Sequence, residues 1–225
     1  MLILALDTTT RPGSLAIVQN GTILGETTGD PSLTHGQRLP ADFQRISDEV
    51  GVPLAEIDLF AVAAGPGSFT GLRVGIAAMQ GLAFAFQRKV VPVSTLDAIA
   101  ARPQATGARV ASWMDAQRHE VFASIPGEID ASSDTPEDIL ASWLSVTDLR
   151  GIEFHGDGAV RYADLIYKVM GKYVRVATTV PLLAGSIGLI AAHAPERAVL
   201  PHAINPIYVR RSDAELARDR RTSSA

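Results

Sequence analysis

A chain of 225 residues suits one large domain or two smaller lobes. Hydrophobic residues make up 47% of it and charged residues 20%, a globular balance that excludes a disordered chain, and no apolar run approaches the roughly 20 uncharged residues of a membrane span. The lack of cysteine excludes disulfides, zinc–thiolate sites and cysteine nucleophiles and favours a cytoplasmic protein, and the net charge of −4 argues against a protein that binds RNA by itself.

The first hundred residues predict alternating strands and helices. Leu2–Leu6 is an apolar run that lacks the basic flank of a signal peptide, so we interpret it as a buried strand that ends on Asp7. Strand-like runs at 14–19 and 22–26 follow, joined by Asn20-Gly21, a dipeptide typical of hairpin turns. Thr34 is predicted to cap a helix whose apolar face carries Leu39, Phe43, Ile46 and Val50, and Pro40 marks either a kink or a later start of that helix. The elements predicted after it are a strand at 59–64, a helix at 70–86, a strand at 90–93 and a helix capped by Ser94. This order, β-β-β-α-β-α-β-α, is typical of a ribonuclease-H-like lobe.

A second unit restarts the pattern at Arg109–Asp115, again an apolar strand that ends on aspartate, and a tight turn leads to a strand at 120–125. Two ribonuclease-H-like lobes in tandem make up the actin-like ATPase (ASKHA) architecture, an α/β fold that we predict here with a reduced second lobe. We place the lobes at 1–102 and 103–225, with a joint at 102–107 and a final segment that could pack back on the first lobe. The remaining sequence shows an acidic stretch at 130–138, a strand-like run at 152–155, and helices around 161–170 and 184–192.

The basic residues concentrate at the end of the chain, which we interpret as a solvated tail. They are Arg210, Arg211, Arg218, Arg220 and Arg221, interspersed with Asp213, Glu215 and Asp219.

Candidate phosphate-binding residues lie where predicted strands end. Asp7, with Thr8 and Thr9, could hold a phosphate or a metal, although it could equally cap its own turn. The turn Gly65-Pro66-Gly67-Ser68 lacks the Gly-Lys-Ser/Thr of a Walker loop, so it is either a backbone anion cradle or a reversal into a helix capped by Ser68 or Thr70. The candidate cofactor-binding residues are Asp7, Thr8, Thr9, Gly65, Gly67 and Asp115.

The helix at 70–86 has one flank almost without side chains, because small residues recur at spacings of three and four. They are Gly71, Gly75, Ala78, Gly81 and Ala85. A glycine inside a helix costs up to about 1 kcal/mol relative to alanine, so three of them suggest a compensating use. We interpret the flank as an interface for another subunit, with some of it used in packing within the lobe.

No catalytic residue and no metal site is predicted. The five histidines form neither an H-x-x-x-H nor an H-E-x-x-H pair, and the chain has no G-x-S-x-G elbow. The turn at 154–158, which includes Gly156 and Gly158, could face the cleft between the lobes.

Five stretches together resemble the TsaB (YeaZ) family, with the most specific similarity over residues 1–125. They are 3–8 (ILALDT), 65–73 (GPGSFTGLR), 93–96 (VSTL), 115–121 (DAQRHEV) and 206–210 (PIYVR).

The resemblance implies a subunit of the bacterial machinery that makes threonylcarbamoyladenosine in tRNA, beside the anticodon. In that family the catalysis belongs to a larger homologue, TsaD, which binds a metal through a histidine pair on its first helix. This chain has His35 in that neighbourhood but Leu39 four residues later, so it does not match the pair. ATP and metal are therefore expected in the partner subunits, with no cofactor in this chain and no activity of the chain alone.

The family pairs with its homologue through two helices of the first lobe, which form a four-helix bundle. The resemblance thus implies a heterodimer with a TsaD-like paralogue, a TsaE-like ATPase as a further partner, tRNA contact only through the complex, and a homodimer when the chain is alone. The expected interface residues are Arg38, Leu39, Phe43, Gly71, Arg73, Val74, Gly75, Ala78, Gly81, Leu82 and Ala85.

One other function stays open, and a second is disfavoured by the residues. A small-molecule kinase of the same architecture would use Asp7 and Asp115 and would bind ATP by itself. A ribonuclease-H-like nuclease needs several carboxylates around two metals, and the fourth predicted strand ends in Ala63-Ala64-Gly65 instead.

Overall fold

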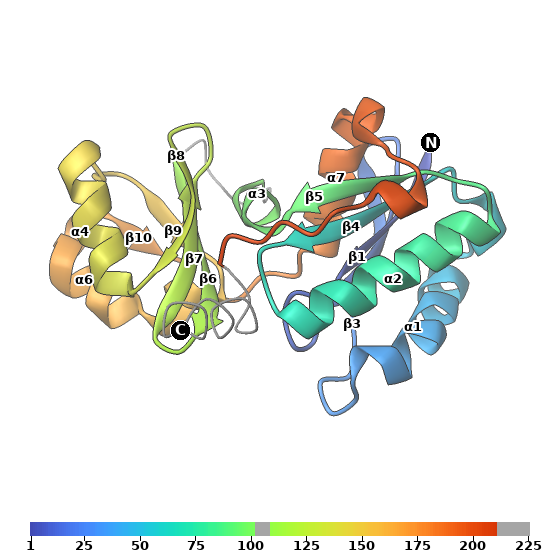
Figure 1. Cartoon of the computed structure of the whole chain (residues 1–225), viewed down its shortest axis with the longest axis horizontal. Coiled ribbons are helices and arrows are strands. Elements are labelled where there is room, and N and C mark those ends of the chain that lie inside the picture. The colour runs from blue at the N-terminus through green and yellow to red at the C-terminus, as the bar shows by residue number, and fades with distance from the viewer. Residues whose placement is uncertain (102–108, 211–225) are drawn as a thin grey trace, which may run out of the picture.

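The computed structural model describes residues 1–101 and 109–210, which form two five-stranded mixed sheets (Figure 1). The strands of the first sheet are β1 (Leu2–Asp7), β2 (Ser14–Gln19), β3 (Thr22–Thr28), β4 (Leu59–Gly65) and β5 (Val90–Ser94). Their order is β3-β2-β1-β4-β5. The pairs β1–β2 and β2–β3 are antiparallel, whereas β1–β4 and β4–β5 are parallel. This strand order places the ends of β1 and β4 next to each other.

Helices cover both faces of the first sheet, which explains why β1 is apolar from Leu2 to Leu6. The helices α1 (His35–Val50) and α2 (Phe69–Ala85) pack on the face that carries Leu4 and Leu6. The helices α3 (Thr95–Ala100) and α7 (Ala184–His193) pack on the face that carries Ile3 and Ala5. Since successive side chains of a strand point to opposite faces, a strand between two helical layers is buried at every position.

The second sheet has the same number of strands and its own core. Its strands are β6 (Val110–Gln117), β7 (Glu120–Ile125), β8 (Ile129–Asp134), β9 (Glu153–His155) and β10 (Arg175–Val176), in the order β10-β9-β6-β7-β8. The helices of this lobe are α4 (Pro136–Val146), α5 (Asp157–Arg161) and α6 (Ala163–Met170). In the core, the Trp113 ring meets Trp143 and Phe154 edge-on, with centroids 6.0 and 5.4 Å away, a favourable aromatic geometry. Short 3-10 helices complete the described residues: η1 (Leu54–Glu56), η2 (Gly171–Tyr173), η3 (Pro195–Arg197) and η4 (Pro201–Ala203).

The chain returns from the second lobe to the first and then crosses back. After α7, residues 204–210 run from the first lobe towards the second, drawn in red in Figure 1. The Ile207 N–H donates to the carbonyl of Ala64 in β4, at 2.7 Å. Further on, the Arg210 guanidinium pairs with the Glu120 carboxylate of β7, at 2.8 Å. We call residues 204–210 the strap.

The predicted element order of the first hundred residues is confirmed. The predicted cap at Thr34 is confirmed, because α1 begins at His35 and includes Pro40, and the alternative of a helix that starts at Pro40 is wrong. The Thr34 backbone N–H, at the start of α1, donates to the Gln37 side chain at 2.9 Å and thereby helps to fix the helix ahead of the proline. Gly51 ends the helix in the left-handed conformation, the usual geometry of a C′ glycine.

The second half contains more structure than its pattern predicted. The acidic stretch at 130–138 forms most of β8 and the first turn of α4, where Thr135 Oγ1 accepts a hydrogen bond from the Asp138 N–H at 3.2 Å. The helix expected at 161–170 is split into α5 and α6 at Tyr162, whose backbone leaves the helical region. The helix expected at 184–192 is present as α7, on the first sheet.

Two predictions fall outside the described residues. They are the joint at 102–107 and the basic tail beyond Arg210, so the lobe boundary at 102/103 stays a prediction. Within the described part, no helix combines the length and the apolar character needed to cross a membrane.

Candidate functional site

A cleft of about 1160 Å³ lies between the two lobes. Its first-lobe wall consists of the β1–β2 loop, residues 31–36 at the start of α1, and the turn that begins α2. Asp115 and Asp157 line it from the second lobe, and residues 207–210 of the strap line it as well. Of the candidate cofactor-binding residues, Thr9, Gly67 and Asp115 line this cleft.

Asp7 is buried beneath the β1–β2 loop and serves that loop. Its Oδ1 atom accepts hydrogen bonds from the Thr9 N–H at 2.8 Å and from Thr9 Oγ1 at 2.6 Å, and its Oδ2 accepts one from Thr10 Oγ1 at 3.4 Å. Burial raises the pKa of Asp7, the loop hydrogen bonds lower it, and the net direction is upward. The carboxylate is thus held by its own turn, and a role in binding a phosphate or a metal stays a prediction.

Asp115 and Asp157 form a second polar cluster on the opposite wall. Both carboxylate oxygens of Asp115 accept hydrogen bonds from Gln117, and Oδ2 also pairs with Arg161 Nη1 at 2.5 Å. Asp157 Oδ1 accepts from the backbone N–H groups of Asp115 at 3.0 Å and Gly158 at 2.9 Å. Burial raises the pKa of Asp157. Asp157 was absent from the candidate residues, although the glycine turn around it was expected to face the cleft.

The turn at 65–68 directs the chain from β4 into α2. Gly65 has a φ of 115°, and a Cβ there would lie 2.5 Å from the Ile207 carbonyl oxygen of the strap. A Cβ on Gly67 would lie 2.5 Å from Thr9 Cβ. Ser68 Oγ then accepts a hydrogen bond from the Gly71 N–H at 3.2 Å and caps α2. These contacts give the turn a structural role, as the start of a helix.

Gly71 and Gly75 belong to an internal contact, which corrects the prediction that they face another subunit. Both are buried, and each faces Thr8 at the end of β1. A Cβ on Gly71 would lie 2.0 Å from the Thr8 carbonyl oxygen, and one on Gly75 would lie 2.0 Å from Thr8 Oγ1. Thr8 Oγ1 donates to the Gly71 carbonyl at 2.8 Å. The close approach that these glycines permit is therefore made by the chain's own loop.

Three expected interface residues on α1 are also buried within the first lobe. Leu39 and Phe43 pack in the core against the first sheet, with exposed fractions of 3% and 6%. Arg38, 5% exposed, pairs with Asp42 and donates to the Pro12 carbonyl in the β1–β2 loop. The family resemblance placed them at the interface because it assigns the pairing to this helix, but it does not say which side of the helix faces the first sheet.

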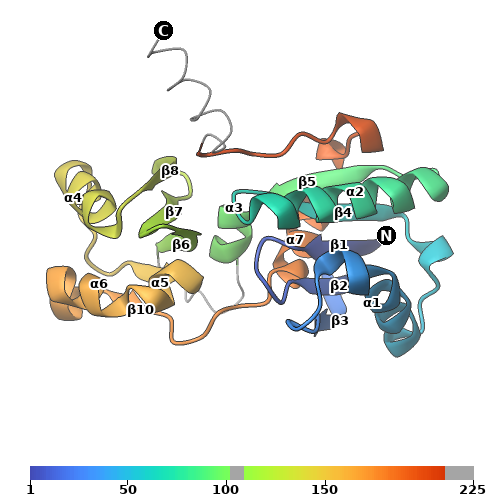
Figure 2. The same cartoon turned by 60° about the horizontal axis from the view of Figure 1, so that its bottom comes forward.

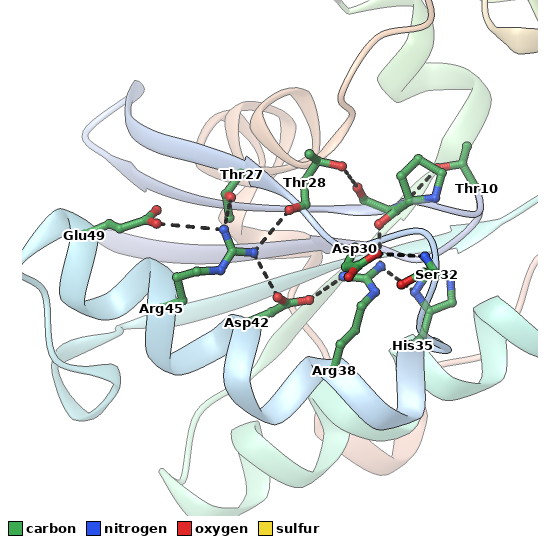
Figure 3. A network of polar contacts seen from close by, with 12 residues as sticks. Thr10, Thr27, Thr28, Asp30, Ser32, His35, Arg38, Asp42, Arg45 and Glu49 are labelled. Atoms are coloured by element: carbon green, nitrogen blue, oxygen red, sulfur yellow. Dashed lines mark hydrogen bonds and ion pairs between the residues drawn. The ribbon is translucent and has the colours of Figure 1, made fainter.

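The polar network around α1 fixes this helix to the loop and to β3 (Figure 3). Arg38 Nη2 donates to His35 Nδ1 at 2.7 Å, and Arg45 donates to Thr27 Oγ1 at 2.6 Å. Asp42 lies between the two arginines and pairs with both. His35 lines the cleft, and burial together with the nearby Arg38 guanidinium lowers its pKa. Its Nδ1 is thus engaged by Arg38, and among the described residues no group of three or more histidines and carboxylates could hold a metal ion.

The outer face of α2 remains exposed and mostly apolar. Of the predicted interface residues on α2, Arg73, Gly81 and Ala85 are exposed, and Val74, Ala78 and Leu82 are partly exposed. Two further exposed residues, Ala77 and Phe84, complete the stripe, and the Phe84 side chain is 81% exposed. Both could have been found by extending the three-and-four spacing along the helix. We define the outer face of α2 as Arg73, Val74, Ala77, Ala78, Gly81, Leu82, Phe84 and Ala85.

The strap passes the first turn of α2. The Arg73 guanidinium lies over the Phe69 ring, 3.9 Å from its centroid, and Tyr208 packs against the same ring at 5.6 Å. A cation over an aromatic face is a stabilising contact, so the first turn of α2 is braced by the strap.

Comparisons with known proteins place these features in a family. Residues 30–168 match the family model of TsaD, described as tRNA N6-adenosine threonylcarbamoyltransferase. The tRNA threonylcarbamoyladenosine biosynthesis protein TsaB of Haemophilus influenzae is 37% identical over 128 residues, which are 55% of this chain and 53% of that protein. The matched part thus spans about half the length of that curated relative, and the same holds for TsaB of Escherichia coli, at 53%.

Solved structures extend the similarity to nearly the whole chain. YeaZ from Pseudomonas aeruginosa is 31% identical, with a TM-score of 0.73 over 92% of this chain and 99% of that one. The activator of the 2-hydroxyisocaproyl-CoA dehydratase from Clostridium difficile, with bound ADPNP, has a TM-score of 0.52 at 13% identity over 87% of this chain and 96% of that one, a likeness of fold alone. The predicted actin-like ATPase fold is thereby confirmed. Since the resemblance seen in the motifs extends to this level of identity and coverage, the chain belongs to the TsaB (YeaZ) family.

Proposed function

We propose that the chain is a non-catalytic subunit of tRNA threonylcarbamoyladenosine biosynthesis that pairs with a TsaD-like paralogue through α1 and α2. The names of its relatives support the pathway, since TsaB of Haemophilus influenzae and the matching family model both refer to this tRNA modification. In this proposal the paralogue transfers the threonylcarbamoyl group to N6 of the adenosine beside the anticodon, and this chain activates it.

The observation that carries the proposal is the outer face of α2. Its apolar side chains follow a single stripe of the helix, and Phe84 at its end is 81% exposed. The small residues Ala77, Ala78 and Gly81 would let a second helix approach closely. α1 packs beside α2 on the same face of the sheet, so a partner with two such helices would complete a four-helix arrangement.

The polar contacts of the cleft support a scaffold more than a kinase. Asp7 accepts hydrogen bonds from Thr9 and Thr10, and Asp115 pairs with Arg161. A small-molecule kinase would use these carboxylates on a metal or on the substrate hydroxyl. Isothermal titration of the isolated chain with MgATP separates the two functions, because a kinase predicts binding with phosphoryl transfer and a scaffold predicts neither.

The remaining partners follow from the same proposal. A TsaE-like ATPase and the TsaD-like paralogue would bind the ATP and the metal, in the cytoplasm, and tRNA would reach this chain within the complex. In isolation the chain would form a homodimer through the outer face of α2, because that apolar surface has no partner there.

Reconstitution of the purified modification system tests the proposed function directly. Omission of this chain is expected to stop the formation of threonylcarbamoyladenosine, measured by mass spectrometry of digested tRNA. Restoration by the added chain, with no turnover by the chain alone, is the expected control. Undiminished modification without the chain would show the proposal to be wrong.

A further inference from the structure

Lysine and tyrosine are concentrated in one short part of the second lobe. The chain has three lysines and four tyrosines, and Lys168, Lys172, Tyr162, Tyr167 and Tyr173 all lie within residues 162–173. Arg175 follows directly, and no acidic residue occurs between Asp164 and Glu196. This local excess of positive charge contrasts with the net charge of the whole chain, which is −4.

The structure exposes most of these side chains along one edge of the second lobe. Met170 and Val174 are buried, whereas the charged and aromatic residues between and beside them face solvent. Tyr167 and Tyr173 are 44% and 58% exposed. We call five residues the basic edge: Tyr167, Lys168, Lys172, Tyr173 and Arg175.

The basic edge is continuous across three elements. Tyr167 of α6 accepts a hydrogen bond at its hydroxyl from the Val176 N–H of β10, at 3.2 Å, which joins the helix to the strand that carries Arg175. Tyr173 belongs to η2, and its carbonyl accepts from the Gly151 N–H at 2.7 Å. β10 is the edge strand of the second sheet, so within residues 1–101 and 109–210 one side of it has no neighbouring strand.

Few acidic groups oppose these cations. Glu153, which pairs with Arg175 at 3.4 Å, has a side chain only 12% exposed. Asp148 pairs with Arg150 at 2.7 Å, and Asp164 lies one turn before Lys168 on α6. Lys168, Lys172 and Arg175 therefore face solvent, and Asp164 is an exposed carboxylate on the same helix as Lys168.

The basic edge lies far from the outer face of α2. In both views α4, α6 and β10 occupy one end of the molecule, and α1 and α2 occupy the other (Figures 1 and 2). A subunit seated on α1 and α2 would therefore leave the basic edge open to a second ligand.

We propose that the basic edge is an RNA-contacting surface, with tRNA as its ligand, an inference that rests on the proposed function for the identity of that RNA. Lysine and arginine neutralise backbone phosphates, and the tyrosine rings offer faces on which unpaired bases can stack. An acidic protein surface would match the cations but would not use the two exposed rings in this way. The net charge of the chain does not reveal this surface, because most of the acidic residues lie elsewhere in the sequence.

The test uses the assembled complex and a fluorescent tRNA transcript, with affinity measured by anisotropy over a series of salt concentrations. The variant Lys168→Glu/Lys172→Glu is compared with Lys89→Glu/Arg197→Glu, which makes the same change in net charge at exposed positions of the first lobe. We expect the first variant to lower the tRNA affinity about tenfold or more and to make its salt dependence shallower by about one to two charges. The control is expected to change the tRNA affinity less than about twofold.

Tyr173→Ala is expected to weaken tRNA binding about fivefold, with recovery in Tyr173→Phe, which keeps the ring.

Each outcome bears on one proposal. Equal loss of tRNA affinity in the two charge variants, or no loss in either, would overturn the RNA surface while leaving the reconstitution result in force. Loss of a protein subunit from the complex in Lys168→Glu/Lys172→Glu, with unchanged tRNA affinity, would assign the edge to a protein and would also overturn it. Undiminished tRNA modification in the reconstitution without this chain would instead reject the proposed function. The anisotropy series on the same variants would still test whether the basic edge binds RNA. Melting curves of all variants check that Lys168, in the last turn of α6, does not act through helix stability.

Discussion

Thr8 and Gly75 touch where the end of β1 meets α2, and a Cβ on Gly75 would lie 2.0 Å from Thr8 Oγ1. Gly75→Ala is therefore expected to lower the free energy of unfolding by about 1–3 kcal/mol, the usual cost of overpacking, although alanine favours a helix. Gly81→Ala is the matched control, because a Cβ there meets nothing within 4 Å. It should raise stability by up to about 1 kcal/mol, and urea denaturation measures both.

A double-mutant cycle assigns the cost to this contact. Thr8→Ala removes the hydroxyl that Gly75→Ala would meet, so the glycine substitution should cost less in the Thr8→Ala background. Additive effects of the two substitutions would contradict the internal role that we give to Gly75.

Ala77→Glu places a charge in the middle of the outer face of α2, where it would be buried by a partner. We expect this variant to lose most of its association with a TsaD-like subunit, in size-exclusion chromatography, while keeping its own stability, because Ala77 is exposed in the monomer. Ala141→Glu, at an exposed position of α4 in the second lobe, is the control and should assemble normally. Equal assembly of both variants would place the partner on another surface.

His35 gives the first lobe a dependence on pH. Burial and the Arg38 guanidinium lower its pKa from 6.5, against the raising effects of the Thr10 backbone and Asp42. The folded state therefore disfavours the protonated ring, so this contribution to stability is complete above pH 6.5 and is lost as the pH falls through the lower folded-state pKa. An NMR titration should give a pKa below 6.5, and His35→Gln should flatten the stability profile over that range. A pKa at or above the usual value would contradict the contact with Arg38.

Ser68 caps α2, so its removal tests the structural role of the turn at 65–68. Ser68→Ala should lower the free energy of unfolding by about 0.5–2 kcal/mol, because the Gly71 N–H loses its acceptor. Ser68→Asp keeps an acceptor and adds a negative charge at the helix N-terminus, so it should retain most of the stability. Denaturation curves compare the two, and equal loss in both would indicate that the cap contributes little.

The first lobe could be predicted because its signals are local. The apolar runs at 2–6 and 59–64 end in turn residues, and Asn20-Gly21 marks the hairpin. The helix at 70–86 and its capping serine follow from the same short-range patterns. Such signals fix the type and order of elements without reference to distant residues.

The structural role of Gly71 and Gly75 could not be predicted locally, because it depends on a residue that is distant in the sequence. Periodicity shows that a helix flank is bare, but it does not show whether a loop or another molecule fills the space, and Thr8 lies 63 residues before Gly71. β8 was missed for a related reason. Its sequence, IDASSD, has no regular apolar alternation, since it is a half-exposed edge strand whose definition depends on pairing with β7.

The position of α7 also affects how the first lobe can fold during translation. Because α7 and α3 together cover the face of the first sheet that carries Ile3 and Ala5, this apolar face is only partly covered until the chain has been translated past His193. The first lobe therefore completes its core only after the second lobe has been synthesised, because α7 follows the second lobe in the chain.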